Sequence, residues 1–447
     1  MSESYLVIGG EGFLGSTMVK TLLTRYPNAT VSSLDLVQRH FPDQLSSSST
    51  SRKWTFYSAD LTSLESLSGA IKQSGATTVF HTASPWTGSG KEVCEKVNVQ
   101  GTQTVVDACV QEGVKKLVFT SSAGTVYNGV DLINVDERMP FPEEELDAYN
   151  VTKAKAERIV LDANGKNGLL TVALRPAGIF GPGDRQALPG VMDVLKSGKT
   201  KFQVGSNENL FDWTYVDNVV HAHMIASERL SHVSTPETLN SRALPIDLDV
   251  KRRKLPTSNY RPPTLLEQEL KLDPSFKNDE EGDLPLLAGR NRFDQFYHLP
   301  AYAASDEQEK NTIKEEAEEE EVPSYEEDLT VAGQAFFVTN GSPIPFWDFP
   351  RAVWAAYNKH EPSFVIPLPA PVGLMFAGIG ETIAGLMGKT PNLTRGKVVY
   401  STVNRYYNIE RARRVLGYEP VVGIEEGIKR AVAWYKENEA QMTPKKA

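Results

Sequence analysis

The chain contains very little cysteine. Only Cys94 and Cys109 occur among its 447 residues, too few for the dense disulfide framework of small secreted domains, and we interpret both as reduced thiols. No apolar signal peptide precedes the first predicted strand. We therefore expect the active domain to face the cytosol.

An excess of basic residues is also missing. The formal net charge is −10, and residues 306–328 hold twelve acidic and two basic side chains, so this segment alone accounts for the imbalance. The remaining sequence is neutral and carries no basic stripe of the kind that binds nucleic acid. We expect no nucleic-acid partner.

The sequence has no clean hydrophobic run of membrane-spanning length. Its most apolar window is 365–388, where Val372–Gly388 gives 17 residues interrupted by Glu381 and Thr382, against the ~20 that a spanning helix needs. Three roles stay open for this window: a helix that lines an apolar substrate pocket, a helix that lies in a membrane interface, or a plain core helix.

What the sequence does have is a glycine-rich turn directly after an apolar strand. The run Tyr5–Ile8 leads into Gly9-Gly10-Glu11-Gly12-Phe13-Leu14-Gly15, and residues 16–24 carry apolar side chains at helical spacing. Such glycines let backbone N–H groups approach a pyrophosphate at a helix N-terminus. The pattern predicts a dinucleotide site, against the alternative of an ordinary βαβ unit with a tight turn. The candidate contacts in the turn are Gly9, Gly12, Phe13, Leu14 and Gly15.

An acidic residue follows at the spacing of a ribose ligand. The second predicted strand, Thr30–Leu34, ends at Asp35, 20 residues after Gly15. A carboxylate there accepts both ribose hydroxyls and repels a 2′-phosphate, which favours NAD over NADP. Arg39 would serve a phosphate if the loop folds back, so the NADP alternative stays open.

Strands and helices alternate up to about residue 230. Strands are predicted at 55–57, 78–81, 116–119 and 170–174, and helices at 64–73, 91–109 and 149–163. This alternation predicts an α/β fold, a Rossmann-type doubly wound parallel sheet.

Three regions are predicted along the chain. Residues 1–240 form the dinucleotide-binding domain, with substrate-domain elements within about 176–210, and residues 331–447 form a smaller substrate-binding domain that contains the 365–388 window. Between them, residues 241–330 lack periodicity and are interpreted as an acidic insertion, largely disordered or loosely helical around Ile313–Glu321. A docking tail for a basic partner is the alternative.

A Tyr-x-x-x-Lys spacing carries the candidate chemistry. Tyr149 and Lys153 share one helix face, so the ammonium can lower the pKa of the phenol. Such a tyrosine can take a proton from an alcohol while hydride leaves the carbon. Roughly one match to this spacing is expected by chance. Among the 16 tyrosines only Tyr149 has it.

Polar residues follow two predicted strands at their carboxyl ends, where an α/β sheet places its ligands. Strand 116–119 ends in Thr120-Ser121-Ser122-Ala123. Ser122 is the candidate donor to the reacting oxygen and Ser121 the runner-up, and either could instead cap a turn. His81 ends the preceding strand and is expected to be structural, because Tyr149 already supplies a base.

Together these motifs resemble the extended short-chain dehydrogenases. The resemblance covers nearly the whole chain outside 241–330 and also includes Asp60-Leu61, His81-Thr82-Ala83, Asn98–Thr102 and Arg175-Pro176. It implies that Ser122, Tyr149 and Lys153 form the catalytic group and that Lys153 also holds the nicotinamide ribose. The further cofactor contacts that it implies are Asp60 and Leu61 beside the adenine, Ala83, Asn98 and Pro176.

Segments 175–184, 209–219 and 336–341 are similar to the 3β-hydroxysteroid dehydrogenase branch, and within it the chain looks most like the decarboxylating sterol-4α-carboxylate 3-dehydrogenases. The resemblance implies that Tyr149 deprotonates the 3β-hydroxyl while hydride passes to NAD⁺. The product is a β-keto acid, which loses CO₂ readily, so no metal is required. An apolar pocket suits the rigid sterol.

The resemblance also implies a location and partners. The sterol carboxylate is the expected substrate, met on the cytosolic face of the endoplasmic reticulum membrane or on lipid droplets. Other enzymes of 4-demethylation and a second copy of the chain are candidate partners. Some members of the family carry an uninterrupted membrane segment. This chain has the interrupted window 365–388 in its place.

Rival functions stay open. One is a dehydrogenase of another steroid or triterpenoid. Another is a nucleotide-sugar epimerase or dehydratase, which would need basic residues for a diphosphate, such as Arg405 or Arg411. A non-enzymatic NAD-sensing regulator would have lost the set Ser122, Tyr149 and Lys153, which this sequence retains.

Overall fold

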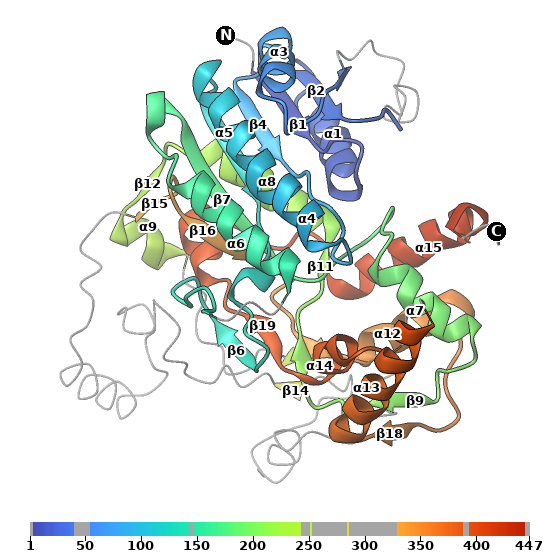
Figure 1. Cartoon of the computed structure of the whole chain (residues 1–447). Helices are drawn as coiled ribbons and strands as arrows, with labels where there is room; N and C mark the ends of the chain where they lie inside the picture. The colour runs from blue at the N-terminus through green and yellow to red at the C-terminus, as the bar shows by residue number, and fades with distance from the viewer. Residues whose placement is uncertain are drawn as a thin grey trace, which may run out of the picture.

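The predicted doubly wound parallel sheet is confirmed. The computed structural model describes residues 3–39, 54–143, 147–242, 251–252, 284–285, 329–387 and 393–442. Its central sheet is parallel throughout and has seven strands in the order β16-β7-β5-β4-β1-β2-β3 (Figure 1). These strands are β1 (Ser4–Ile8), β2 (Thr30–Asp35), β3 (Trp54–Ser58), β4 (Thr78–His81), β5 (Lys116–Thr120), β7 (Leu170–Pro176) and β16 (Ala335–Val338).

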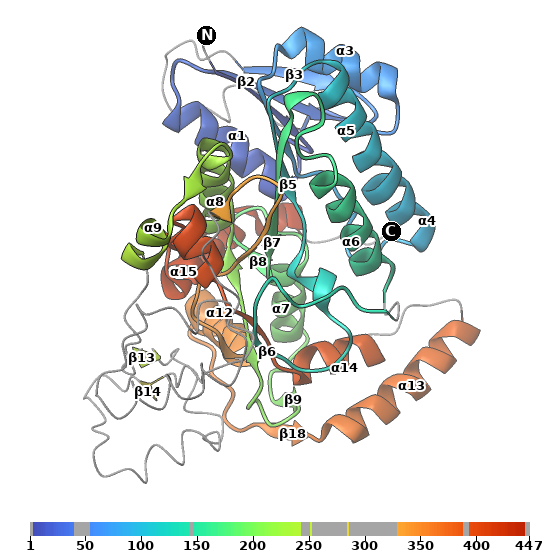
Figure 2. The same cartoon turned by 90° about the vertical axis from the view of Figure 1, so that its left-hand side faces the viewer.

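Helices cover both faces of this sheet. Figure 2 shows α1 (Phe13–Arg25) and α8 (Val216–Arg229) on one face, with α3 (Leu64–Ser74), α5 (Gly101–Gln111) and α6 (Ala148–Leu161) on the other. Strand β1 is buried throughout and supplies Tyr5 and Val7 to one hydrophobic core and Leu6 and Ile8 to the other. This two-residue alternation between two apolar layers explains why the strand reads as an unbroken apolar run.

The helix predicted at 91–109 is interrupted. It divides into α4 (Lys91–Cys94), a π-helical segment η1 (Glu95–Gln100) and α5. Wider turns of this kind are often found at functional sites. Here the segment contains Asn98, whose side chain is buried.

A smaller sheet lies below the carboxyl ends of the large one. Its order is β17-β10-β19-β6, formed by β17 (Ile344–Pro345), β10 (Leu210–Phe211), β19 (Arg405–Tyr407) and β6 (Leu132–Val135). The chain therefore passes between the two layers several times, and β16, from the region assigned to substrate binding, forms an edge strand of the large sheet.

Five helices and one short strand pair complete this lower part (Figure 1). They are α7 (Ala187–Lys196), α12 (Asp348–Asn358), α13 (Ala370–Leu386), α14 (Arg395–Thr402) and α15 (Ile424–Met442), with β9 (Phe202–Val204) paired to β18 (Ile366–Leu368).

The remaining described elements are short. They are η2 (Ala123–Val126), η3 (Lys166–Gly168), η5 (Ala412–Leu416), β8 (Ile179–Phe180), β11 (Thr214–Tyr215), β12 (Val233–Ser234), α9 (Pro236–Ser241), β13 (Lys251–Arg252), β14 (Leu284–Pro285) and β15 (Leu329–Thr330). Apart from α9, β13, β14 and β15, the predicted insertion 241–330, including Ile313–Glu321, lies almost wholly outside the described residues.

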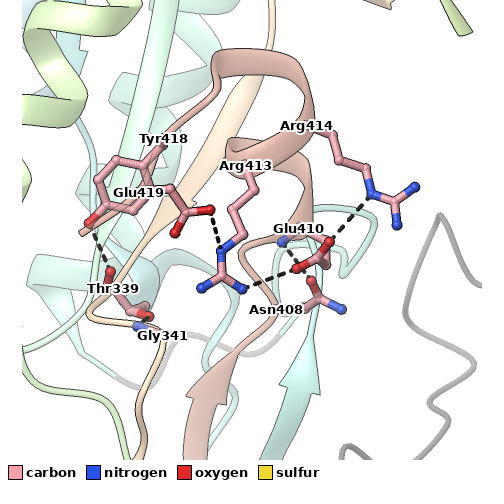
Figure 3. A network of polar contacts seen from close by, with 8 residues as sticks. All are labelled: Thr339, Gly341, Asn408, Glu410, Arg413, Arg414, Tyr418 and Glu419. Atoms are coloured by element: carbon pink, nitrogen blue, oxygen red, sulfur yellow. Dashed lines mark hydrogen bonds and ion pairs between the residues drawn. The ribbon is translucent and has the colours of Figure 1, made fainter. Parts of the chain in front are cut away.

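A polar network ties the chain after β19 to the large sheet (Figure 3). Glu410 accepts hydrogen bonds from Arg413 at 3.1 Å and Arg414 at 3.3 Å. The Tyr418 hydroxyl donates to the Thr339 carbonyl, directly after β16, at 2.8 Å. These contacts fix the position of β19 relative to the carboxyl edge of the large sheet.

Asp212 holds the other side of β19. Its backbone N–H donates to the Arg405 carbonyl at 3.0 Å, and its carboxylate accepts from the Tyr407 N–H at 2.9 Å. The carboxyl is almost fully buried, and this burial raises its pKa to about 7 because it disfavours the charged form.

This raised pKa predicts a pH-dependent stability. An unfolded Asp212 releases its proton near pH 3.8, whereas the folded protein keeps it up to about pH 7. Between these values the folded state binds more protons, so stability falls as pH rises through this window, by up to about 1.4 kcal/mol per pH unit. We expect Asp212→Asn, which has no proton to lose, to reduce the fall of the melting temperature measured between pH 5 and pH 8, while buried Glu137, whose pKa is also raised to about 7, keeps its own contribution. A slope unchanged from the parent would contradict this assignment.

Candidate functional site

The glycine turn packs closely against the start of α1 and against the chain just beyond β4. Gly9 has a φ of +81°, and a Cβ there would lie 2.6 Å from the Ala83 backbone nitrogen beyond β4. A Cβ on Gly15 would lie 2.1 Å from the Gly9 carbonyl. Gly12 caps α1 in an extended conformation without a side-chain hydrogen bond. The first N–H groups of the helix, at Phe13 and Leu14, are thus not capped by a side chain, as an anion site requires.

Asp35 stands at the end of β2, the strand beside this turn. It is partly exposed, and its Oδ1 accepts from the Leu36 N–H at 2.8 Å. The loop behind it does fold back, because the Arg39 N–H donates to Glu11 at 2.8 Å. The structure therefore places an exposed arginine close to the predicted ribose site, as the NADP alternative required.

Glu11 is a site residue that the sequence reasoning missed. It is 3% exposed and also accepts from the Ser33 hydroxyl at 2.9 Å, so it joins the glycine turn to β2 and to the loop after Asp35. The available signal was an acid in the middle of a turn made otherwise of glycine.

Asp60 and Leu61 follow β3 on the same side. The Asp60 carboxylate accepts hydrogen bonds from the Thr62 N–H at 2.9 Å and from the Thr62 hydroxyl at 2.8 Å. Both bonds lower the pKa of Asp60, and the bond from the backbone N–H contributes most. Leu61 packs against the start of α5, where a Cβ on Gly101 would lie 1.8 Å from it. Their contact with adenine stays a prediction.

Asn98 connects the end of β4 to α6. Its side-chain amide donates to the Thr152 hydroxyl at 3.0 Å and accepts from the Ser84 hydroxyl at 3.0 Å. Ser84 also hydrogen-bonds to Tyr149. Asn98 thus fixes the first turn of α6, and Ser84 is a second residue that the sequence reasoning did not identify.

Tyr149 lies in the first turn of α6 and is partly buried. Burial raises its pKa above the ordinary value, Ser84 lowers it in part, and Asp147 and Cys94 raise it further. Lys153 is not among the groups that shift this pKa in the structure, because its ammonium is directed toward β5, so its effect on the phenol stays a prediction.

Lys153 extends toward β5 instead. Its Nζ donates to the Thr120 carbonyl and lies 4.2 Å from the centroid of the Phe119 ring, and the side chain is 2% exposed. Burial lowers its pKa to about 7, although Glu157 acts in the opposite direction. The lysine is therefore close to losing its charge at neutral pH.

The two candidate serines have different surroundings. Ser121 is buried and donates to Glu157 at 2.6 Å, and Glu157 forms a buried ion pair with Arg175. Ser122 is partly exposed and caps η2 by accepting from the Gly124 N–H at 3.0 Å. Ser122 is thus the capping serine that the sequence reasoning left open, but its own hydroxyl hydrogen is still available to a substrate oxygen.

The turn that contains Ser122 lies against the start of α6. A Cβ on Gly124 would lie 2.0 Å from the Asn150 side chain, next to Tyr149. The structure therefore brings Ser122 and Tyr149 to the same edge of the sheet. Their roles, and that of Lys153, stay predictions.

The remaining predicted residues line this edge. His81 is fully buried, bonds to the Thr102 hydroxyl at 3.0 Å, and has a pKa lowered to about 3 by burial, which fits the expected structural role. Pro176 ends β7, opposite Val338 of β16.

Cys94 and Cys109 are both buried free thiols.

Comparison with known proteins identifies the family. The family model of the 3-beta hydroxysteroid dehydrogenase/isomerase family matches residues 6–244. The chain belongs to this family. It is 36% identical to sterol-4-alpha-carboxylate 3-dehydrogenase, decarboxylating, of Schizosaccharomyces pombe, with 97% of each chain covered. The human protein of the same name is 30% identical, with 96% of this chain and 87% of the human protein covered.

Solved structures agree on the fold. An epimerase from Methanothermobacter thermautotrophicus superposes with a TM-score of 0.60 at 18% identity, covering 99% of this chain and 94% of its own. The dTDP-glucose 4,6-dehydratase of Bacillus anthracis, solved with NAD, gives a TM-score of 0.57 at 14% identity, covering 99% and 100%. The family therefore uses the same doubly wound architecture here.

The position of Asp35 predicts its effect on cofactor choice. Replacing Asp35 by Ala removes the acceptor for the ribose hydroxyls and the charge that repels a 2′-phosphate. We expect the dissociation constant for NAD to rise on the order of tenfold, while that for NADP stays level or falls. Fluorescence titration with NADH and NADPH measures both, with Asp107→Ala on the outer face of α5 as the matched control. An unchanged ratio would remove Asp35 from the site.

Proposed function

We propose that this chain oxidises the 3β-hydroxyl of a 4α-carboxysterol to the ketone with NAD and that the product loses CO₂, a step in the removal of the 4-methyl groups during sterol biosynthesis. The observation that carries the proposal is the near full-length identity of 36% to a decarboxylating sterol-4-alpha-carboxylate 3-dehydrogenase. The site supports it, because Ser122, Tyr149 and Lys153 are all retained at one edge of the sheet.

The glycine turn and Asp35 are suited to NAD, which supplies the hydride acceptor when bound. On the protein side, Ser122 donates a hydrogen bond to the reacting oxygen and Tyr149 takes its proton. Lys153 shares a helix face with Tyr149, so a change of rotamer away from Thr120 would place its charge beside the phenol and offset the effect of burial.

Loss of CO₂ needs no further catalytic residue. In the β-keto acid, the bond between carbon 4 and the carboxylate breaks, and its electron pair moves into an enolate on the new ketone. Carbon 4 then takes a proton from water. The role of the protein is to make the ketone beside the carboxylate.

The proposal is tested with Tyr149→Phe, which removes the hydroxyl and keeps the ring. On a detergent-dispersed 3β-hydroxysterol-4α-carboxylic acid, we expect turnover, followed by NADH absorbance, to fall by roughly 10²–10⁴-fold. NADH binding should persist, because the phenol acts on the substrate. The matched control Tyr357→Phe removes a hydroxyl from α12, where it bonds to Glu439, and should keep activity.

Two outcomes would contradict the proposal. Turnover of Tyr149→Phe within a few-fold of the parent would show that Tyr149 is not the base. Failure of the parent to oxidise the acid, with UDP-glucose turned over instead, would favour the nucleotide-sugar alternative.

We also propose how the protein meets a water-insoluble substrate. Helix α13 buries only Gly373 and Ala377, and Gly373 rests against Val204 of β9 and Val398 of α14. Its apolar side chains are otherwise largely exposed, which argues against the core-helix alternative. The side chains that are more than half exposed are Met375, Phe376, Ile379, Ile383, Leu386 and, just beyond the helix, Met387.

This helix lies along the lower edge of the molecule beside β18 (Figure 2). Phe364 and Ile366 extend the exposed apolar surface, and Arg395, paired with Glu381, lies at its border. None of the helices that the structure describes is long and apolar enough to cross a bilayer. A helix lying in the interface fits this geometry. The proposed location is the cytosolic face of the endoplasmic reticulum or a lipid droplet.

Charged substitutions on α13 test the attachment. We expect the double variant Phe376→Glu, Ile379→Glu to move from the membrane to the soluble fraction, because both side chains are exposed and the charges oppose insertion. Activity on dispersed substrate should remain. Val421→Glu, at an equally exposed apolar residue remote from α13, is the matched control. A double variant that stays membrane-bound would contradict this role for α13.

A further inference from the structure

An arginine at the start of β19 is enclosed by aromatic rings. The guanidinium carbon of Arg405 lies 4.1 Å from the centroid of Tyr127, 5.1 Å from that of Tyr400 and 5.7 Å from that of Phe211. Among the described residues, no carboxylate pairs with it. Buried arginines are ordinarily paired, because an uncompensated buried charge is costly.

Polar atoms without partners gather around this arginine. Arg405 Nε and the Tyr127 hydroxyl are buried and have no hydrogen-bond partner among the described residues, and the buried Tyr407 hydroxyl lies beside the Arg405 guanidinium and interacts with it. The two tyrosines are 9% and 6% exposed. A guanidinium with an open N–H and two tyrosine hydroxyls near it is suited to an anion with several acceptor oxygens, such as a carboxylate.

The location of this group connects it to the proposed catalytic residues. Tyr127 ends η2, the short helix that Ser122 caps. Tyr127 also lines a cavity of about 210 Å³ together with Asn150, the neighbour of Tyr149. The arginine is thus one side chain away from the turn that contains Ser122.

The opposite side of the group faces the cofactor region. Tyr400 is close enough to Asp184 for the two side chains to interact electrostatically. The adjacent Gly183 packs near Phe13 of the glycine turn, because a Cβ on Gly183 would lie 3.4 Å from the Phe13 ring. Arg405 therefore lies between the turn of Ser122 and the loop next to the predicted pyrophosphate site.

The surroundings fit a large apolar ligand that carries one charge. Phe211 packs on Trp213 and Phe346 with ring centroids 4.9 and 5.4 Å apart. Tyr400 remains 37% exposed and is the member of the group that reaches the surface. It belongs to α14, which packs against α13, so this side of the group lies next to the proposed lipid contact.

We propose that Arg405, with the hydroxyls of Tyr127 and Tyr407, binds the carboxylate of the substrate and selects the acid over the neutral sterol. This inference rests on the proposed function. In the substrate the carboxylate stands on the carbon next to the one oxidised, so its binding site must lie close to the base. Holding that carboxylate orients the 3β-hydroxyl toward Ser122 and Tyr149.

The structure fixes Arg405 firmly enough for this role. Its strand lies between β10 and β6. Asp212 holds the backbone on both sides of Tyr406, and the network of Figure 3 fixes the chain that follows. A side chain set in this way loses little conformational entropy on binding.

The experiment compares two substrates that differ only in the carboxyl group at carbon 4. One is a 3β-hydroxysterol-4α-carboxylic acid, and the other is the same sterol with a methyl group in place of the carboxyl. For Arg405→Met, which keeps the apolar stem, we expect kcat/KM on the acid to fall by about 10²-fold, with most of the change in KM. On the neutral sterol it should change by no more than a few-fold. Arg405→Lys should recover part of the loss.

Two milder variants keep the arginine. Tyr127→Phe and Tyr407→Phe each remove one hydroxyl beside Arg405, and each should lower kcat/KM several-fold on the acid alone, even if Arg405→Met fails to fold. Equal losses on both substrates in a folded variant, or none on the acid, would overturn the carboxylate site. A parent that does not oxidise the acid would overturn the proposed function itself, so the two failures are distinguishable.

Discussion

The close packing of the glycine turn against the start of α1 and against the chain just beyond β4 is the constraint on which the rest of the site depends. It requires hydrogen in place of a side chain at two glycines, because a Cβ on Gly15 would lie 2.1 Å from a backbone oxygen and one on Gly9 would meet the backbone at Ala83. Because of these contacts, the N-terminus of α1 lies at the point where the strand order reverses between β1 and β4. Asp35, Asn98, Ser122 and Tyr149 are then placed by the parallel strands and helices that follow.

The sequence predicted the parts of this arrangement that depend on local chemistry. An apolar strand, a glycine turn and an acid at a fixed distance follow from backbone geometry and can be recognised without coordinates. It could not predict which way a long side chain turns. Lys153 lies on the expected face of α6, yet its ammonium bonds to the Thr120 carbonyl, because that strand end presents an acceptor and an aromatic face. The roles of Glu11 and Ser84 could not be predicted, because their hydrogen-bond partners are far away in the sequence.

The two cations of the site are held in different ways. Lys153 shares its helix with Glu157 and bonds to a backbone carbonyl, so burial can lower its pKa to about 7. Arg405 has aromatic faces and tyrosine hydroxyls around it, and a guanidinium stays charged under all such conditions. A lysine is therefore suited to a charge that changes during a proton transfer, and an arginine to a charge that must persist while an anion is bound.

The packing of α13 against α14 relates the proposed lipid contact to the charge of Arg405. The exposed apolar face of α13 requires small residues on its buried side, Gly373 and Ala377, and Gly373 lets the helix rest on Val204 and Val398. The same packing positions α14, whose partly exposed Tyr400 lies beside Arg405. An apolar molecule that leaves a bilayer beside α13 would meet aromatic rings first and the positive charge last. A sterol acid can follow that path to the end, whereas a neutral sterol would leave the charge without a partner.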